Sequence, residues 1–235
     1  MKPRISIHRN RALTLVEVLV VIATLVILAM ILLPVLAAAQ RRSAKINCVS
    51  NLKQVNLSFR IWEGDNNNQY PMTVSTTSGG AMEAVATGDV VTCFICMSNE
   101  LSTPKVLVCP VEAEFGKTAA TNFLDDLNNS HISYFVGVDA DEAYPRRIMS
   151  GDDNFQIGGA AIPSGLFQLS TNASIAWDSH RHDSITRMPW LGIPIKHHLV
   201  GNLGFADGSV GMFDTTALRK VLVETDLATN RLAIP

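Results

Sequence analysis

The sequence of 235 residues contains none of the short motifs that mark the common nucleotide-dependent and metal-dependent enzymes. It has no G-x-x-x-x-G-K-[ST] phosphate loop, no G-x-G-x-x-G dinucleotide fingerprint and no H-E-x-x-H zinc motif. The stretch from Asp207 to Gly211 differs from the nucleophile elbow G-x-S-x-G at its first residue, and no strand–turn–helix pattern surrounds it. We therefore expect a protein that is not an enzyme.

Acidic residues are absent from the first twelve positions, where four of the 19 basic residues lie. Without these four, 15 basic residues remain against 21 acidic ones, a balance of −6, whereas the whole chain carries −2. An acidic body is a poor match for phosphate backbones, so we expect no nucleic-acid partner. The basic residues of the leader are Lys2, Arg4, Arg9 and Arg11.

Charge is also scarce from Leu13 to Ala39, where Glu17 is the only ionisable side chain. A membrane-spanning helix needs about 20 apolar residues, and this stretch provides them. The positive-inside rule keeps the basic leader in the cytoplasm and exports everything after the span. Pro34 falls in the outer part of the span, and its missing N–H predicts a helix kink. We therefore expect a single-pass membrane protein.

Three interpretations of this segment are open. The first is a cleaved signal peptide, because Ala37 to Ala39 offer a small-residue cleavage site. The apolar run is longer than a usual signal core, however, and the helical pattern continues past that site. The second is an uncleaved anchor, which leaves Glu17 as an unexplained cost of up to about 2.5–3.5 kcal/mol at the bilayer centre.

The third interpretation rests on residues 12–17, which read Ala12-Leu13-Thr14-Leu15-Val16-Glu17. This segment resembles the type IV prepilin cleavage motif of pili and of type II secretion pseudopilins, although that family usually has Gly before the cut and Phe after it. The resemblance implies that a prepilin peptidase cuts between Ala12 and Leu13 and methylates the new amine of Leu13. Glu17 then pairs with the amine of an adjacent subunit and sets the axial register between helices.

The helical period continues beyond the span until a turn signal at residues 64–68. Apolar residues recur at three- and four-residue steps on one stripe, formed by Val49, Leu52, Val55, Phe59 and Trp62. We predict one helix of about fifty residues, transmembrane in its first half and amphipathic in its second. The predicted organisation is a leader at 1–12, a transmembrane segment at 13–39, an amphipathic segment at 40–64 and a globular domain at 65–235.

Short apolar runs separated by turn residues follow the helix. Long connectors rich in Gly, Asn and Asp lie between them, notably at 79–88 and 150–165. The predicted fold is α+β, with an antiparallel sheet packed on the exposed half of the long helix. The predicted strands are Val90–Met97, Lys105–Cys109, Ile132–Val138, Ser174–Trp177 and Ser209–Phe213, and the predicted helix is Thr216–Glu224, capped by Thr215 or Thr216.

A second resemblance lies near the C-terminus. His197 is followed by nine residues and then by Asp207 and Gly208, which is similar to the H-X9-DG element of a large subgroup of prepilin-type proteins. The segments NCVSNLKQ, VLVCP and ISYFVGVDADE are also similar to that subgroup. The Asp-Gly pair predicts a tight hairpin turn before the strand at 209–213, with His197 capping or bracing it.

The four cysteines form an even set in a compartment that permits disulfides. They are Cys48, Cys93, Cys96 and Cys109. Structural disulfides or buried thiols are the first interpretation. The alternative is a zinc site built from the C-x-x-C pair, Cys109 and a histidine, although a second half-site is missing. In a regular strand Cys93 and Cys96 would point to opposite faces, so their pairing would require a turn.

Two acidic groups are candidate calcium ligands, because calcium takes six to eight oxygens, often from loops. No EF-hand loop is present, and solvated side chains are the alternative; no cofactor is required. A weaker candidate set for a transition metal contains four histidines, for which exposed loop residues are the commoner explanation. The calcium candidates are Asp139, Asp141 and Glu142, and Asp152 and Asp153 with Asn154; the transition-metal candidates are His180, His182, His197 and His198 with Asp178 and Asp183.

The resemblance implies a structural subunit that polymerises into the filament of a type II secretion or type IV pilus-like system. A secretion pseudopilus is favoured because the acidic body has no basic groove. The implied partners are copies of the chain, other pilin-like subunits, the prepilin peptidase, and an inner-membrane platform with its ATPase. The implied location is the inner membrane, with a periplasmic filament after assembly. The alternatives are an anchored calcium- or carbohydrate-binding module that does not polymerise, and a secreted enzyme released at Ala39.

Overall fold

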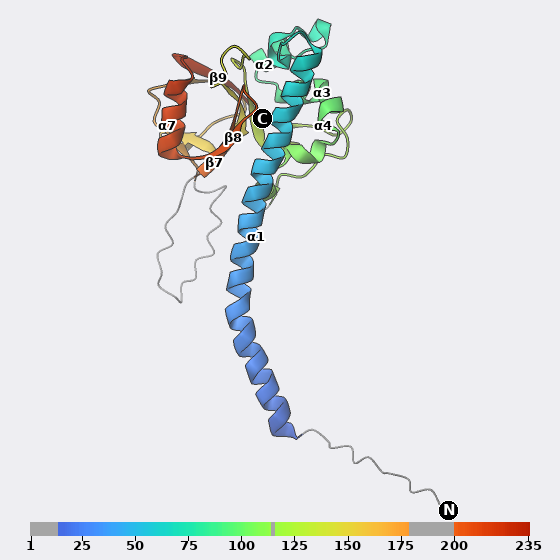
Figure 1. The fold of residues 1–235 in the computed structure, drawn as a ribbon, viewed down its shortest axis with the longest axis vertical. Coiled ribbons are helices and arrows are strands. Elements are labelled where there is room, and N and C mark those ends of the chain that lie inside the picture. Colours follow the sequence, from blue (N-terminus) through green and yellow to red (C-terminus); the bar gives the residue numbers. More distant parts are fainter. Residues whose placement is uncertain (1–13, 114–115, 179–199) are drawn as a thin grey trace, which may run out of the picture. The chain divides into compact units, whose positions relative to one another are not determined.

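The computed structural model describes residues 14–113, 116–178 and 200–235. The chain divides into two compact units, Met1–Ser43 and Ala44–Pro235. One helix of 51 residues, α1 (Leu15–Asp65), begins in the first unit and ends in the second (Figure 1). The prediction of a single helix of about fifty residues is therefore confirmed.

In the first unit, α1 is long and apolar enough over Leu15–Leu36 to cross a membrane, and none of that segment is buried. The helix continues through Pro34. Because proline has no N–H, the carbonyl of Met30, four residues earlier, lacks its intrahelical hydrogen bond. A kink at this position stays a prediction.

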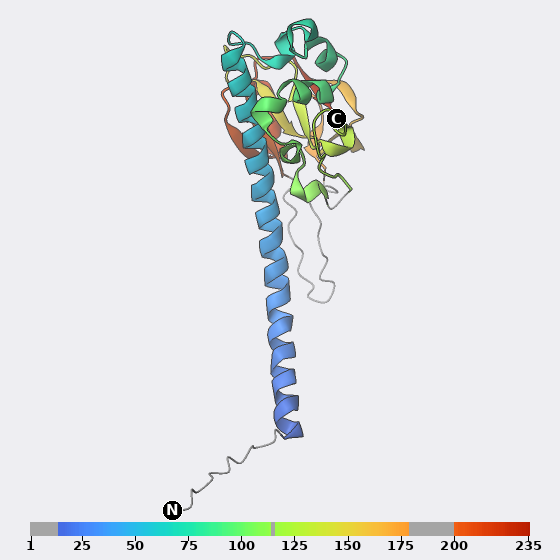
Figure 2. The ribbon, with the colours of Figure 1, turned by 90° about the vertical axis from the view of Figure 1, so that its right-hand side faces the viewer.

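In the second unit, α1 has a buried face. Four residues of the predicted stripe (Leu52, Val55, Phe59 and Trp62) are at most 5% exposed. They share one buried cluster with residues of the next helical segments and of the strands that follow. Figure 2 shows the layer of short helices (green) in front of the strands (yellow to red). These segments are η1 (Pro71–Thr73), η2 (Thr76–Ser78), α2 (Met82–Ala86), α3 (Val90–Cys96), α4 (Ser98–Leu101), η3 (Pro104–Leu107), α5 (Pro110–Ala113) and η4 (Asn129–His131).

Two of the predicted strands are wrong. Residues 90–96 form α3, because the carboxylate of Asp89 accepts hydrogen bonds from the backbone N–H groups of Val91 (2.9 Å) and Thr92 (3.2 Å) and so caps a helix. Residues 104–107 form η3, whose first position is a proline and whose cap is the side chain of Thr103. In both segments a local cap outweighs the β-propensity of a valine-rich run.

The described residues form nine strands in two antiparallel sheets. The larger sheet has the order β5-β9-β1-β2-β7-β8, and the smaller has the order β4-β3-β6. The α+β prediction is therefore confirmed. The strands are β1 (Tyr134–Gly137), β2 (Ile148–Asp152), β3 (Phe155–Ile157), β4 (Ala160–Ala161), β5 (Gly165–Ser170), β6 (Ile175–Trp177), β7 (Val200–Phe205), β8 (Val210–Asp214) and β9 (Thr229–Ile234).

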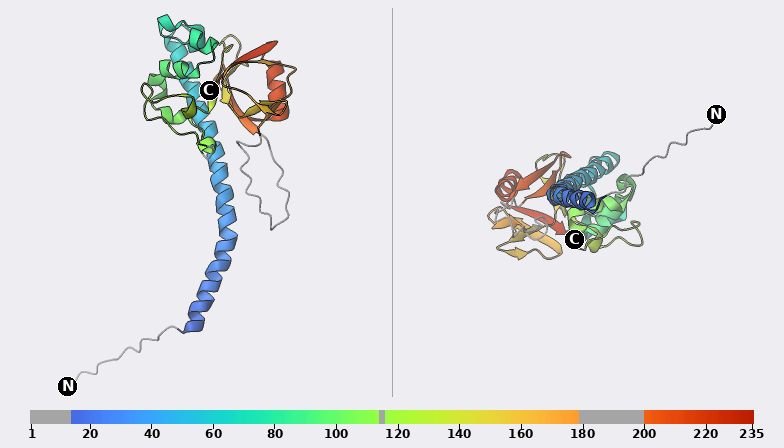
Figure 3. Two further views of the ribbon diagram at one scale, coloured as in Figure 1. Left: turned by 180° about the vertical axis from the view of Figure 1, so that it is seen from behind. Right: turned by 90° about the horizontal axis from the view of Figure 1, so that it is seen from below.

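Three of the predicted strands are confirmed; they are β1, β6 and β8. The predicted connector at 150–165 is wrong in part, because it contains the end of β2 together with β3 and β4. The predicted C-terminal helix is α7 (Thr215–Glu224), which packs against β6 and β8 and is the red helix in Figures 1 and 3. Its cap is Asp214, whose carboxylate accepts from the Ala217 N–H at 2.7 Å, and not Thr215 or Thr216.

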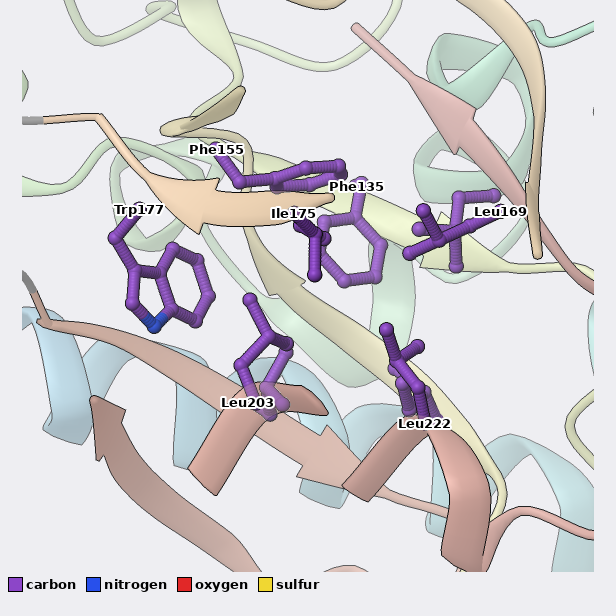
Figure 4. Close-up of a pocket in the computed structure, with 10 residues that line it drawn as sticks. Phe135, Phe155, Leu169, Ile175, Trp177, Leu203 and Leu222 are labelled. Carbon is purple, nitrogen blue, oxygen red and sulfur yellow. The ribbon is translucent and has the colours of Figure 1, made fainter. Parts of the chain in front are cut away.

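The two sheets and α7 enclose a second apolar cluster. Phe155 packs edge-on against Phe135 and Trp177, with ring centroids 5.6 and 6.2 Å apart (Figure 4). The cavity that remains among them is about 10 Å³ and is lined only by apolar and aromatic residues. A void of this size and chemistry stays dry, so we assign it to core packing and not to ligand binding.

Candidate functional site

The first turn of α1 is closed by Glu17. Its Oε2 atom accepts hydrogen bonds from the backbone N–H of Thr14 at 2.7 Å and from the Thr14 hydroxyl at 2.8 Å. In return, the Thr14 hydroxyl accepts from the Glu17 N–H at 3.3 Å. This reciprocal pair is a capping box, which satisfies two N–H groups at the start of a helix and places a negative charge at the positive end of its dipole.

The capping box gives Glu17 a role within its own chain, which our sequence analysis missed. The signal was present, because Thr14 to Glu17 match the S/T-x-x-E pattern of a helix start. The residues of the predicted cleavage, Ala12 and Leu13, lie outside the described part of the chain. Cleavage, methylation and the register role of Glu17 stay predictions.

The Asp207-Gly208 pair makes the predicted hairpin turn between β7 and β8. Gly208 has a φ of +83°, which favours glycine, and its N–H donates to the Phe205 carbonyl at 2.9 Å. The carboxylate of Asp207 accepts from the Ser209 N–H at 2.8 Å, and the Phe205 N–H donates to the Ser209 carbonyl at 2.9 Å. His197, the other member of the H-X9-DG element, lies outside the described residues.

This hairpin is bound to α1 by polar groups. Asn56 is fully buried on α1, and its amide donates to the carbonyls of Phe205 and Ser209, each at 3.4 Å, while its oxygen accepts from the hydroxyl of Ser150. The Tyr70 hydroxyl donates to the Ala206 carbonyl at 2.6 Å. The Asp-Gly turn therefore serves as an attachment point between the C-terminal hairpin and the helix.

The side chain of Arg60 joins the same region. Its guanidinium donates to the Tyr70 hydroxyl at 3.0 Å and lies 3.3 Å from the Glu63 carboxylate and 3.4 Å from that of Glu142. The hydrogen bond with Tyr70 raises the pKa of Arg60, and burial raises the pKa of Glu63. The Arg60 guanidinium thus forms ion pairs with two carboxylates, that of Glu63 on α1 and that of Glu142.

The cysteines divide into one disulfide and two thiols. Cys48 on α1 and Cys109 before α5 form a disulfide, and both are buried. The Tyr134 hydroxyl donates to the Cys48 carbonyl at 3.3 Å, so β1 contacts α1 at the same place. Cys93 and Cys96 are free thiols on α3. Because Cys109 is bonded to Cys48, it cannot be a ligand of the alternative zinc site formed by the C-x-x-C pair, Cys109 and a histidine.

The acidic calcium candidates are engaged with basic groups or backbone N–H groups. Asp139 binds the Arg231 guanidinium at 2.9 Å and its backbone N–H at 3.0 Å, and Asp141 accepts from the Ala143 N–H at 2.9 Å. Across residues 14–113, 116–178 and 200–235, no group of three or more His, Cys, Asp or Glu is arranged to hold a metal ion. The histidine candidates at 180, 182, 197 and 198, and Asp183, lie outside those ranges.

A buried polar cluster holds the second acidic group. The ammonium of Lys117 lies 2.7 Å from the Asp153 carboxylate and 3.6 Å from that of Glu112, which is 1% exposed. Burial and the charge of Asp153 raise the pKa of Glu112 to about 8. Beside this cluster, burial raises the pKa of Asp152 to about 7, although the N–H and amide of Asn202 donate to it at 2.8 and 2.9 Å. Lysine occupies the position that a cation would need, so this cluster fits an internal ion pair better than a metal.

A surface hollow of about 410 Å³ lies between α4 and the loop at residues 122–125. Leu124 at its edge is 79% exposed. Four of its six lining side chains are polar, whereas small-molecule pockets are lined mostly by hydrophobic and aromatic side chains, so the hollow is a weak candidate for a ligand site. Its lining residues are Ser98, Asn99, Asn122, Phe123, Leu124 and Asp125.

Comparison with known proteins adds no relative, since no family model, no curated protein and no solved structure matches this chain.

Proposed function

We propose that the chain is a membrane-anchored pilin-like subunit of the pseudopilin type, which polymerises into a secretion or pilus-like filament. The observation that carries the proposal is a 51-residue helix whose Leu15–Leu36 segment is apolar and unburied and contains a single charge, Glu17, in its first turn. An apolar surface of this length requires lipid or other helices around it. In the filament, we propose that helices of neighbouring subunits supply that cover.

The second half of α1 supports the proposal in another way. Its buried residues share a cluster with β1, β2 and the short helices, and its polar Asn56 binds the Asp-Gly hairpin. We propose that the antiparallel sheet packs on this half of the helix, so that the helix carries the domain 65–235 on its amphipathic segment 40–64. A force on the transmembrane segment would then be transmitted to the domain through continuous helix.

Two independent features support the orientation that we propose for the membrane segment. The leader 1–12 carries four basic and no acidic residues, which favours a cytoplasmic N-terminus. The Cys48–Cys109 disulfide lies after the span, and disulfides persist mainly in oxidising compartments. We therefore propose an inner-membrane protein with an exported domain, processed between Ala12 and Leu13 and methylated on Leu13.

The register role of Glu17 is compatible with its cap. Thr14 donates both of its hydrogen bonds to the Oε2 atom of Glu17. The carboxylate therefore keeps acceptor capacity at Oε1 for the N-terminal amine of an adjacent subunit. Breaking such a pair inside an apolar filament core leaves an uncompensated charge, which costs about 3–5 kcal/mol.

An anchored binding module that does not polymerise is the second candidate. The capping box favours it, because the cap explains Glu17 without any neighbouring subunit. The hollow beside Asn99 and Phe123 would then be its ligand site. The two candidates differ in whether Glu17 acts through its charge or only through a hydrogen-bonding oxygen.

The test uses three variants of the full chain in a bacterium with a prepilin peptidase and a filament assembly system. Glu17→Gln keeps an N3 acceptor for the cap but removes the charge, Glu17→Ala removes both, and Thr14→Ala removes the cap partner but keeps the charge. The measurements are the N-terminal mass of the chain and the fraction recovered in sheared filaments.

For a pilin-like subunit we expect a methylated Leu13 N-terminus, near-normal incorporation of Thr14→Ala, and incorporation of both Glu17 variants reduced by at least about a hundredfold. Equal recovery of all variants in the membrane, with no filament fraction even for the wild type, would instead support the anchored module. An N-terminus at Gln40 would refute both candidates, because the span would then be a discarded signal.

A further inference from the structure

Two thiols lie one turn apart at the end of α3. Cys93 is fully buried, whereas Cys96 is half-buried and is the last residue of the helix. The Cys96 thiol donates to the Cys93 carbonyl at 3.0 Å. In the predicted strand the two side chains would point to opposite faces, whereas the helix brings them to the same side.

The helix geometry is suitable for a disulfide. Residues three apart in an α-helix have Cα atoms about 5 Å apart, from a rise of about 1.5 Å per residue and a radius of about 2.3 Å. Disulfides need roughly 4.4–6.8 Å between Cα atoms. Because Cys96 ends α3, only the last turn has to adjust when the sulfurs join. With both thiols free, Phe94 between them packs against Phe59 of α1, with ring centroids 6.3 Å apart.

We propose that Cys93 and Cys96 are a redox-active dithiol, which exchanges with a disulfide-bearing small molecule or protein and closes reversibly into a bridge within α3. This chemistry does not depend on whether the chain assembles into filaments. It also differs from that of Cys48 and Cys109, which are already bonded to each other.

The different exposure of the two thiols sets the order of the steps. Cys96 is the one that a reagent can reach, so its thiolate attacks one sulfur of the oxidant R–S–S–R, forms a mixed disulfide and releases one R–S⁻, which takes up a proton. Cys93 then loses its proton, attacks the Cys96 sulfur and releases the second R–S⁻, also protonated. Two electrons and two protons pass from the dithiol to the oxidant, giving one bridge and two R–SH.

Cys93 is suited to the second step and not to the first. Its contact with the Cys96 thiol and its burial raise the pKa of the Cys93 thiol well above its usual range, so free thiolate is scarce there. An intramolecular attack on an adjacent mixed disulfide tolerates this scarcity, because the reacting sulfur is held close. Cys96 is thus the attacking residue and Cys93 the resolving one.

The bridge should open and close without unfolding the domain. Cys48 and Cys109 are 61 residues apart, whereas Cys93 and Cys96 are three apart, so the short bridge constrains the unfolded chain far less. Cys48 and Cys109 are also 0% and 1% exposed, which shields them from reductant in the folded protein. Half-buried Cys96 has no such protection.

The experiment uses the full chain in detergent without denaturant. The protein is incubated with glutathione disulfide, or with dithiothreitol, quenched in acid, alkylated and mapped by mass spectrometry. We expect glutathione disulfide to produce a Cys93–Cys96 bridge and dithiothreitol to remove it, while Cys48–Cys109 stays intact throughout. In the Cys93→Ser variant we expect a glutathione adduct to accumulate on Cys96, and in Cys96→Ser no adduct on Cys93.

The wild-type measurement decides the proposal even if a variant fails to fold. Free thiols at both positions after prolonged treatment with glutathione disulfide would overturn it. So would a bridge from Cys93 or Cys96 to Cys48 or Cys109 in place of the helical pair. A glutathione adduct at Cys93 in the folded Cys96→Ser variant would overturn the assigned order of attack.

Discussion

The Cys48–Cys109 disulfide joins α1 to the segment that leads into β1, and its contribution to stability can be worked out from the chain. The two cysteines are 61 residues apart. Loop-closure entropy for a ring of that size corresponds to about 4 kcal/mol at room temperature, because the unfolded chain loses the freedom to separate its ends. Opening the bond should therefore lower the free energy of unfolding by about 4 kcal/mol.

The assay is denaturant unfolding of the full chain in detergent, followed by tryptophan fluorescence, to which the buried Trp62 and Trp177 (5% and 0% exposed) contribute. Oxidised wild type is compared with wild type whose disulfide has been opened by reductant under denaturing conditions and then refolded. The Cys48→Ala/Cys109→Ala double variant is the control, since any response of its stability to reductant comes from Cys93 and Cys96 and can be subtracted. A difference of less than about 1 kcal/mol between the two forms of the wild type would refute the loop-closure reasoning.

Two further predictions concern the buried acid and the hairpin turn. Because the pKa of Glu112 is about 8 in the folded chain and lower in the unfolded chain, folding takes up a proton, and the free energy of unfolding should fall as pH rises from about 4.5 to 8. Glu112→Gln should flatten that decline in pH-dependent denaturant unfolding; an unchanged slope would contradict the assignment. Gly208→Ala should cost about 1 kcal/mol, because a φ of +83° is unfavourable for a residue with a side chain, whereas the control Gly64→Ala in α1 should be neutral or stabilising. Thermal unfolding compares the two, and equal shifts would show that the turn is not strained.

The sequence predicted α1 well because two strong signals agree along its length. A membrane-length apolar run and then a stripe at helical spacing both persist until the turn residues after Asp65. Leu52 and Phe59 are buried as the spacing requires. Long periodic segments average over local exceptions, and even the buried Asn56 on the same face did not obscure the pattern.

The secondary structure of short segments was harder to predict, because a single capping residue can determine whether such a segment forms a helix or a strand. The run from Val90 is rich in β-branched and apolar residues, and its propensity favours a strand. A single carboxylate at Asp89 closes the first turn and makes it helical. Residues 150–165 were predicted as a connector because they are rich in glycine and polar residues. They form strands because partners distant in the sequence pair with them, as Trp177 does with Phe155.

Individual residues of the candidate site could be predicted from the sequence, but the contacts that they make with distant parts of the chain could not. The Asp207-Gly208 turn was identified from two letters because only a few residues tolerate a positive φ. Its attachment to Asn56 and Tyr70 depends on residues more than a hundred positions away. Likewise, four cysteines allow three pairings when two disulfides form, and spacing alone cannot select Cys48 with Cys109.

If the proposed function is correct, the side chain of Glu17 meets two requirements at successive stages. Processing between Ala12 and Leu13 would retain Thr14, so the capping box would survive it. Before assembly, the cap and the helix dipole lower the cost of holding a carboxylate at the end of an apolar span. After assembly, a neighbouring amine would add the compensating charge that the cap lacks. The cap itself needs only an oxygen at position 17, and the helix dipole already favours a charged Glu over Gln there. The Glu17→Gln variant therefore tests whether assembly, on the proposed function, makes a further demand on that charge.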